Sequence, residues 1–347
     1  KDFMYWERQL CTTNVNVDVP ASFIQVGNIP PLTNEEGSFY GFWDDGYDIY
    51  LQIKWQQIPE ERRKAFRAAM ESEETVLLNG TEYKISSHYI NDTYCPFSEA
   101  DGLKVFPCLS ELDLKEYHQG LIKYLKDTPF VDELTYRGKE RGSLDFRGTS
   151  LRRLHIDLTG IDELWLNDEM EQLYLLNDTI SPCVIHTRDN GSNLLLQYRK
   201  IFHPYPELSN LNKLHGIEIN EVDMNDIFSV YPNLKELRLW GKPGYIRNFS
   251  VIERFRNIEV FTTRNLFGFN SQDIPIPERM EHLSWFWMTS LPEDAAKMAK
   301  KLYKKRKKEG MNISVTQARK PEWIKESMDN PFRDWDGSGQ ISSSSAK

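Results

Sequence analysis

Histidine, cysteine and paired acidic residues are the side chains of this 347-residue chain that could catalyse a reaction or bind a metal. The seven histidines are dispersed, and one close pair stands out, Cys183 and His186 in the sequence Cys-Val-Ile-His. On an extended strand, residues three apart point to opposite faces, so we expect Cys183 to face inward and His186 outward, with no shared metal. Adjacent carboxylates such as Asp162 and Glu163 diverge in the same way. The sequence therefore predicts no catalytic residue, no metal site and no cofactor.

The motifs that mark hydrolases, nucleotide-binding proteins and zinc proteases are absent. The chain contains no G-x-S-x-G, Walker A, G-x-G-x-x-G or H-E-x-x-H segment. One partial match is an EF-hand-like loop near the C-terminus, with Asp334 and Asp336 at its first and third positions. Its twelfth position is Ser345 instead of glutamate, which removes two of the roughly seven ligand oxygens. We expect a polar turn without micromolar calcium affinity, and calcium-regulated binding is the alternative.

The charge balance argues against bulk attraction to nucleic acid or to an anionic membrane. Lys and Arg number 43 against 52 Asp and Glu, which gives a formal net charge of −9. Positive charge is concentrated in residues 297–308, which favour a solvated cap helix whose lysines complement the helix dipole. A patch for an acidic partner or a nucleic acid is the alternative. Nucleic acid is not expected, because no aromatic stacking platform accompanies the lysines.

The sequence favours a cytoplasmic protein without a membrane partner. No stretch approaches the roughly 18 apolar residues that a membrane span requires. The four cysteines, Cys11, Cys95, Cys108 and Cys183, include no CxxC pair, and reduced, buried thiols are the simplest interpretation. Six N-x-S/T sequons, the first at Asn79, leave a secreted origin open.

A repeat of about 21 residues runs through the middle of the chain. Apolar residues recur with the spacing L-x-x-L-x-L in nine copies, the first at Leu109 and the last at Met280. A single copy buries too little apolar surface to stand alone, so the copies must stack on one another. We expect the central apolar residues to stack in one core, and these are Leu112, Leu134, Leu154, Leu173, Leu194, Ile217, Leu237, Phe261 and Leu283.

The segments TSLRRLHIDL (149–158) and PNLKELRLWG (232–241) resemble the strand segment of leucine-rich-repeat proteins. The resemblance covers residues 109–288, with irregular repeats, because the usual Asn or Cys after the third apolar residue is mostly missing. It implies an α/β solenoid with one parallel strand per repeat and a concave face that binds a partner.

The segments between the strands are expected to differ along the chain. Half-period copies, Ile161/Leu164/Leu166 and Ile180/Cys183/Ile185, leave no room for a helix and predict extended returns on the convex side. Apolar residues at helical spacing predict short helices over 116–128 and 248–256. A last helix should begin at a capping box of Ser290 and Glu293, end at Gly310, and precede a final strand from Met311.

Three parts follow from the period. Residues 1–105 lack it and predict a small N-terminal α+β domain or cap with an extended arm. In this part, residues 48–55 alternate like a strand, a helix begins at Pro59, and Asn79-Gly80 predicts a hairpin turn. Residues 106–320 predict the solenoid with its basic cap helix, and residues 321–347 a C-terminal tail.

The predicted binding surface is the concave face of the parallel sheet. Tyr, Trp and Arg dominate binding hot spots, because they bury a large area and keep a polar group. The predicted partner-binding residues are Tyr174, Leu176, Leu195, Arg238, Trp240, Arg264 and Phe286. The sequence therefore favours a non-enzymatic protein whose partner is a protein or peptide. An enzyme or enzyme subunit, with activity in the N-terminal domain and repeats that select the substrate, is the alternative.

Overall fold

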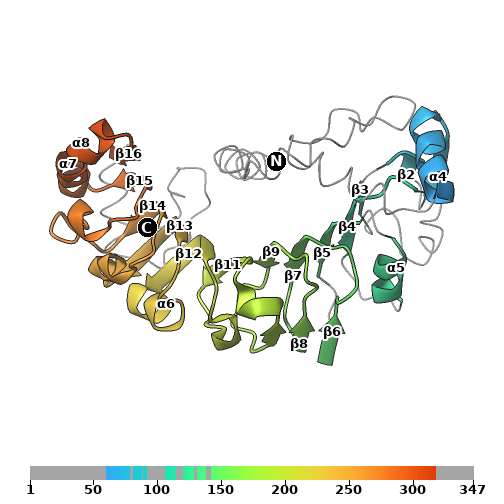
Figure 1. The fold of residues 1–347 in the computed structure, drawn as a ribbon, viewed down its shortest axis with the longest axis horizontal. Coiled ribbons are helices and arrows are strands. Elements are labelled where there is room, and N and C mark those ends of the chain that lie inside the picture. The colour runs from blue at the N-terminus through green and yellow to red at the C-terminus, as the bar shows by residue number, and fades with distance from the viewer. Residues whose placement is uncertain are drawn as a thin grey trace, which may run out of the picture. The chain divides into compact units, whose positions relative to one another are not determined.

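The computed structural model describes residues 60–78, 81–87, 89–91, 106–114, 120–128, 131–137 and 142–317 (Figure 1). The chain divides into two compact units. The first unit comprises Lys1–Asp113 and Asp127–Val131, and the second comprises Leu114–Lys126 and Asp132–Lys347. The predicted strand at 48–55, the hairpin turn at 79–80 and the calcium-type loop in the tail lie outside the described residues.

The first unit contains a helix and a hairpin, as the sequence predicted. Helix α4 (Glu60–Glu71) is followed by β1 (Thr75–Leu78) and β2 (Thr81–Lys84), which pair antiparallel. Strand β3 (Tyr89–Asn91) pairs in parallel with β4 (Glu111–Leu114). Phe66 and Ala69 of α4 pack with Cys108 in a small core. Burial raises the pKa of the Cys108 thiol to about 12, so this cysteine stays protonated.

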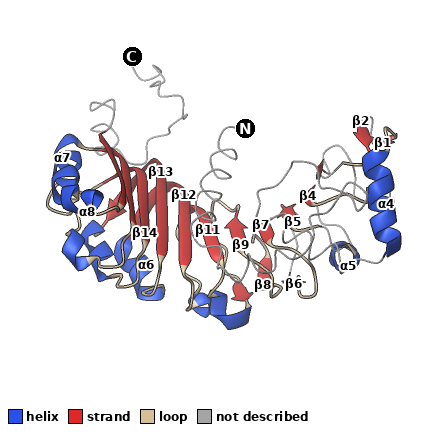
Figure 2. Cartoon of the chain, turned by 45° about the horizontal axis from the view of Figure 1, so that its top comes forward, coloured by secondary structure: helices blue, strands red, loops and turns tan. Residues whose placement is uncertain are grey.

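The second unit is built on one long sheet whose strands are all parallel (Figure 2). In spatial order, its strands are β5 (Glu133–Tyr136), β7 (Arg153–Ile156), β9 (Gln172–Leu175), β11 (Leu195–Ile201), β12 (Lys213–Asp223), β13 (Glu236–Arg247), β14 (Val260–Phe267), β15 (Trp285–Leu291) and β16 (Asn312–Gln317). The predicted parallel sheet of an α/β fold is therefore present.

Apolar side chains on neighbouring strands lie in register along the inner face of this sheet. One row of paired residues runs through Leu134, Leu154, Leu173, Leu196, Leu214, Leu237, Phe261, Phe286 and Ile313. Of the predicted core positions, Ile217 is wrong, because its side chain is only partly buried. Leu194 and Leu283 are buried as predicted but lie outside this row. The L-x-x-L spacing does not show which apolar residue of a segment comes first. Where further apolar residues flank the segment, the spacing can therefore be assigned to the wrong residues.

A second, smaller sheet is formed by the returning segments. Strands β6 (Gly142–Asp145), β8 (Ile161–Trp165) and β10 (Val184–His186) pair in parallel, with β8 in the centre. Leu144, Leu164 and Ile185 lie in register and are buried. The prediction of extended returns is therefore confirmed, with β8 in the first half-period copy and β10 at the end of the second.

Other connecting segments contain helices, one before the small sheet and several after it. Helix α5 (Leu121–Asp127) precedes β5, and α6 (Met224–Val230) lies between β12 and β13. The segment predicted as a helix over 248–256 forms the 3₁₀ helix η5 (Phe249–Arg254). Two more short 3₁₀ helices are η4 (Pro206–Leu208) and η6 (Pro277–Arg279), and η3 (Arg188–Gly191) is a kinked turn.

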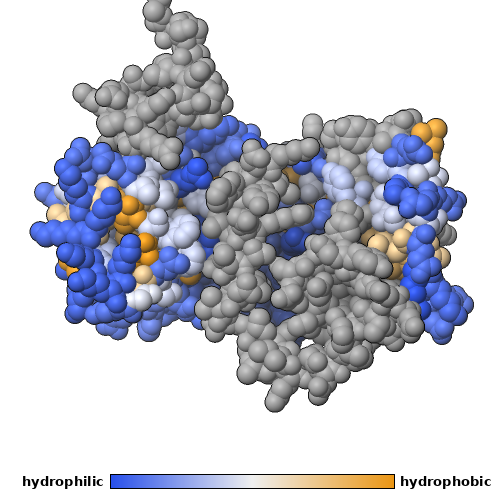
Figure 3. All heavy atoms as spheres, turned by 90° about the horizontal axis from the view of Figure 1, so that it is seen from above, coloured by the Kyte–Doolittle hydropathy of each residue, from blue (hydrophilic) through white to orange (hydrophobic). Residues whose placement is uncertain are grey.

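The basic segment at the end of the unit is helical but interrupted. Helix α7 (Glu293–Leu302) ends at Tyr303, and α8 (Lys304–Lys308) continues to the left-handed Gly310. The predicted capping box is wrong, because Pro292 is the N-cap residue and Ser290 belongs to β15. The surface over α7 and α8 is mostly hydrophilic (Figure 3), and no described helix is long and apolar enough to cross a bilayer.

Candidate functional site

The candidate site is the outer face of the long sheet, the side opposite the core row. Side chains alternate between the faces of a strand, so two outer rows flank the core row. The first outer row is Glu133, Arg153, Gln172, Leu195, Lys213, Glu236, Val260, Trp285 and Asn312. The second outer row is Thr135, His155, Tyr174, Gln197, His215, Arg238, Thr262, Trp287 and Ser314.

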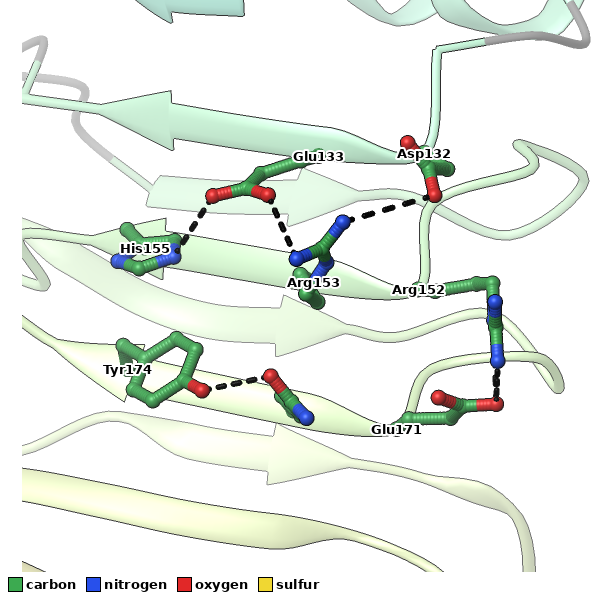
Figure 4. Close-up of polar contacts among 8 residues, drawn as sticks. Asp132, Glu133, Arg152, Arg153, His155, Glu171 and Tyr174 are labelled. Carbon is green, nitrogen blue, oxygen red and sulfur yellow. Dashed lines mark hydrogen bonds and ion pairs between the residues drawn. The ribbon is translucent and has the colours of Figure 1, made fainter. Parts of the chain in front are cut away.

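At the N-terminal end of the outer face, charged groups pair with one another (Figure 4). The two oxygens of Glu133 contact Arg153 at 3.1 Å and His155 at 3.2 Å. The His155 ring stacks on Tyr174, with 4.2 Å between ring centroids. The Tyr174 hydroxyl donates a 2.6 Å hydrogen bond to the side chain of Gln172. These contacts hold the side chains in place and leave little net charge at this end.

The same pairing extends along the edge of these strands. Arg152 and Glu171, one position outside the first outer row, are joined at 2.5 Å, and Asp132 lies 3.9 Å from Arg153 (Figure 4). The nearly buried Asp132 and Glu133 carboxylates would be costly without cationic partners. Arg153, which contacts both of them, therefore has a structural role in this part of the sheet.

In the middle of the outer face, one carboxylate joins two neighbouring strands. Glu236 accepts hydrogen bonds from His215 Nε2 at 2.7 Å and from Arg238 Nε at 2.6 Å. Burial alone would raise the pKa of Glu236, but the hydrogen bond from His215 and the charges around it prevail and lower the pKa to about 2. Burial lowers the pKa of His215, partly offset by its bond to Glu236, so this ring is neutral at pH 7 and donates Nε2–H.

The C-terminal end of the outer face is aromatic. Trp285 and Trp287 lie two residues apart on the same face of β15. Their ring centroids are 4.7 Å apart, and their planes are tilted by 31°. Trp287 Nε1 donates a 2.9 Å hydrogen bond to Asn312 on the next strand. On the other side, Trp240 of β13 pairs in register with the exposed Arg264 of β14. Partly exposed indole rings thus lie beside a solvent-exposed guanidinium group.

The predicted site residues differ in their exposure to solvent. Tyr174, Leu195 and Arg238 lie on the outer face as expected, but each is only 5 to 7% exposed, so they offer little surface to a partner. Leu176 and Trp240 are partly buried and Arg264 is exposed. Arg238, Trp240 and Arg264 lie on the neighbouring strands β13 and β14.

Phe286 is a correction to the predicted site. Its side chain is fully buried, pairs with Phe261 in the core row, and stacks on Tyr303 at 3.9 Å between ring centroids. The predicted frame puts Met280, Leu283 and Trp285 inward, whereas the strand uses Leu283, Phe286 and Met288. Moving the pattern by an odd number of positions reverses the two faces of the strand.

That correction identifies residues that the sequence pattern missed. Trp285 and Trp287 take the outward positions that the predicted frame gives to Ser284 and Phe286. Lys213 and His215 likewise take the places that it gives to Glu218 and Asn220 on β12. The triplet Leu283, Phe286 and Met288 fits the repeat as well as the predicted one and would have revealed both tryptophans.

In the described part of the chain, no group of three or more His, Cys, Asp or Glu residues could hold a metal ion. Cys183 is nearly buried, and His186 stacks on Trp165 with 3.7 Å between ring centroids. The sequence matches no protein-family model and no curated protein. Function is therefore inferred from the outer face itself.

Proposed function

We propose that the second unit is an irregular leucine-rich-repeat solenoid that binds another protein or peptide on its outer face, without catalysis of its own. The repeat pattern, the parallel strands and the in-register core row support the solenoid. This arrangement resembles the leucine-rich-repeat family in having one strand per repeat.

One observation carries the binding proposal: partly exposed tryptophans and an exposed arginine gather on β13, β14 and β15. Trp and Arg are the residues enriched at binding hot spots, since each buries a large area with few rotatable bonds or a planar donor group. The strands that carry them are joined in parallel register over five pairs between β14 and β15. A partner would therefore meet a pre-organised surface, which lowers the entropic cost of binding.

The test compares capture of partners by the wild type, by Trp287→Ala and by a matched control, Phe228→Ala. Phe228 is a partly buried aromatic residue of α6, which covers the other face of the sheet. Each protein is immobilised, and captured polypeptides are quantified by mass spectrometry. A binding partner should be retained by Phe228→Ala and weakened by at least about 2 kcal/mol in Trp287→Ala.

Thermal unfolding of the two variants serves as the control for folding. If all three proteins capture the same polypeptides with equal affinity, the outer face is not the binding surface. Loss of capture in Phe228→Ala alone would place binding on the helical side and would also contradict the proposal.

The alternative, an activity in the N-terminal domain, concerns residues 1–105, most of which lie outside the described residues. No observation on the described residues favours it.

A further inference from the structure

The outer face changes in charge from one end of the sheet to the other. From β5 to β11, cations have close carboxylate partners: Arg153 contacts Glu133, Arg152 contacts Glu171, and Arg199 contacts Asp178 at 3.2 Å and Glu218 at 2.8 Å. From β12 to β14, Lys213, Arg238 and Arg264 face a single outer-row carboxylate, Glu236. The C-terminal end therefore carries excess positive charge in a chain whose formal net charge is −9.

Two of these cations are available to a partner. Lys213 and Arg264 are exposed, and neither forms an ion pair or hydrogen bond with any described residue. Arg238, between them, is only 5% exposed and is held by Glu236. Lys213 and Arg264 thus lie at the two ends of a diagonal across β12, β13 and β14.

The length of this diagonal suits an extended polypeptide. Two strand spacings of about 4.8 Å and four residues of about 3.3 Å place the two Cα atoms about 16 Å apart. Carboxylates four residues apart in an extended segment are separated by about 13 Å, and flexible Lys and Arg side chains span the difference. The tryptophans of β15 lie next to the Arg264 end, because Thr262 pairs with Trp287 and Arg264 with Thr289.

We propose that the outer face of β12–β15 binds an extended acidic protein segment, whose carboxylates contact Lys213 and Arg264 and whose apolar side chains contact Trp285 and Trp287. This inference rests on the proposed function and names the chemistry of its partner. A single-stranded nucleic acid is a poorer match, since Trp285 and Trp287 lie against each other and do not form a flat platform for successive bases.

The basic helices α7 and α8 are the competing anion-binding surface. Lys300, Lys304 and Lys307 are exposed there, and Lys297 is paired with Glu293. Lysines on an exposed helix remain hydrated and screened by salt beyond about 8 Å, so they contribute to the rate of association more than to a lasting contact. Any test must therefore separate the two surfaces.

The experiment measures fluorescence anisotropy of a labelled peptide of about nine alternating Glu and Val residues, which extends to about 30 Å. The same peptide with Gln in place of Glu and a short oligothymidine are the comparison probes. The proteins are the wild type, Arg264→Glu, Lys213→Glu, and the helix double variant Lys300→Gln with Lys304→Gln. Thermal unfolding confirms that each variant is folded.

We expect the acidic peptide to bind the wild type and the glutamine peptide to bind at least tenfold more weakly. Arg264→Glu and Lys213→Glu should each weaken the acidic peptide by about tenfold or more, and the helix variant by less than about twofold. Absence of binding, binding lost only in the helix variant, or tighter Arg264-dependent binding of oligothymidine would each overturn the inference. If Trp287→Ala still abolishes partner capture in any of these cases, the proposed function stands and only the acidic partner is wrong.

Discussion

Two regions of the long sheet have the same apolar core row but differ in the segments that cover it. In the first region, the core leucines Leu134, Leu154 and Leu173 lie on the short strands β5, β7 and β9, and the repeats that separate them are short. In the second, strands β12 to β15 are longer, and the chain between successive core residues from Leu214 to Phe286 is longer as well. The two regions also differ in what covers the core.

In the first region and just after it, the return path contains a strand. The returns form the sheet β6, β8 and β10, and Leu164 faces the core between the two sheets. The longer repeat accommodates α6, η5 and η6. Length alone does not decide the structure of a return, because the spacing from Leu173 to Leu196, which contains β10, equals the spacing from Leu214 to Leu237, which contains α6.

The longer strands also share a kink that the shorter ones lack. The pairing register shifts in β11, β12, β13 and β15. Residues with positive φ lie near these breaks in β11, β12, β14 and β15, and these are Lys200, Glu218, Asn265 and Ser290. In β13 the break contains Gly241 and Gly244, where a Cβ atom would come within 2.3 Å of Asn265 O and 2.1 Å of Ile219 O. Bulges of this kind bend a strand and let it continue past the core.

The largest effect should come from breaking that kink with Gly244→Ala. A methyl group 2.1 Å from a backbone oxygen can be accommodated only if the β12–β13 backbone moves. We expect the free energy of unfolding to fall by at least about 3 kcal/mol. Chemical denaturation measures it, with Gly148→Ala, at an open turn in the first region, as the matched control. An effect of Gly244→Ala below that of the control would show that the kink is not a fixed feature.

Acidification should lower the free energy of unfolding of the second region, through Glu236 and His215. The folded pKa of Glu236 is lowered to about 2, so its stabilisation is complete above pH 4.5 and is lost as the pH falls toward 2. The lowered pKa of His215 acts in the same direction and begins near pH 6.5, because the unfolded state binds that proton first.

The free energy of unfolding should fall by at most about 3 kcal/mol when Glu236 is protonated, because that is the energy equivalent of its lowered pKa. Thermal unfolding between pH 7 and pH 3 measures it. Glu236→Gln should flatten the pH dependence over the acidic part of this range. An unchanged slope in that variant would assign the acid sensitivity to other groups.

Removing the acceptor at the boundary between the regions should destabilise the small sheet. Glu207 Oε1 accepts a 2.7 Å hydrogen bond from the buried backbone N–H of Ile185 in β10, in place of a further strand. Glu207→Ala should cost about 1 to 2 kcal/mol, because it leaves that donor unsatisfied. Faster hydrogen exchange at the Ile185 amide is the direct measurement. Glu207→Gln keeps an acceptor and should exchange nearly like the wild type; equal protection in all three proteins would contradict this role.

The smallest effect should be a gain in stability. Thr263 is buried on the inner face between Leu239 and Met288, and its Oγ1 has no hydrogen-bond partner. Thr263→Val has nearly the same shape without the unsatisfied hydroxyl, so the free energy of unfolding should rise by about 1 kcal/mol. Thr263→Ser keeps the hydroxyl and loses the methyl group, so it should destabilise. A loss of stability in the valine variant would mean that the hydroxyl is satisfied after all.

The sequence by itself determined the repeat, the parallel strands and much of the core. Leu134, Leu154, Leu173 and Leu237 lie in the core row as predicted. Each is the second residue of its strand and is followed two positions later by another buried apolar or aromatic residue. The extended returns were also predictable, since half-period copies of the apolar pattern lie in them. These features depend on local spacing, which the sequence shows directly.

The tertiary structure alone decided the register wherever apolar residues are plentiful. Leu196, Leu214 and Phe286 enter the core row in place of Leu194, Ile217 and Leu283, because pairing with the neighbouring strand selects one of two equally apolar frames. That choice buries Phe286 and turns Trp285 and Trp287 outward.

The charge pattern of the outer face was decided in the same way. Glu133 and Arg153 belong to successive repeats and contact each other only through the strand register. The same register sets Lys213 opposite Glu236 without an ion pair between them, and it sets Arg264 opposite Trp240. Such contacts join side chains from different repeats, so no spacing within one repeat determines them, and they appear only when the strands are paired.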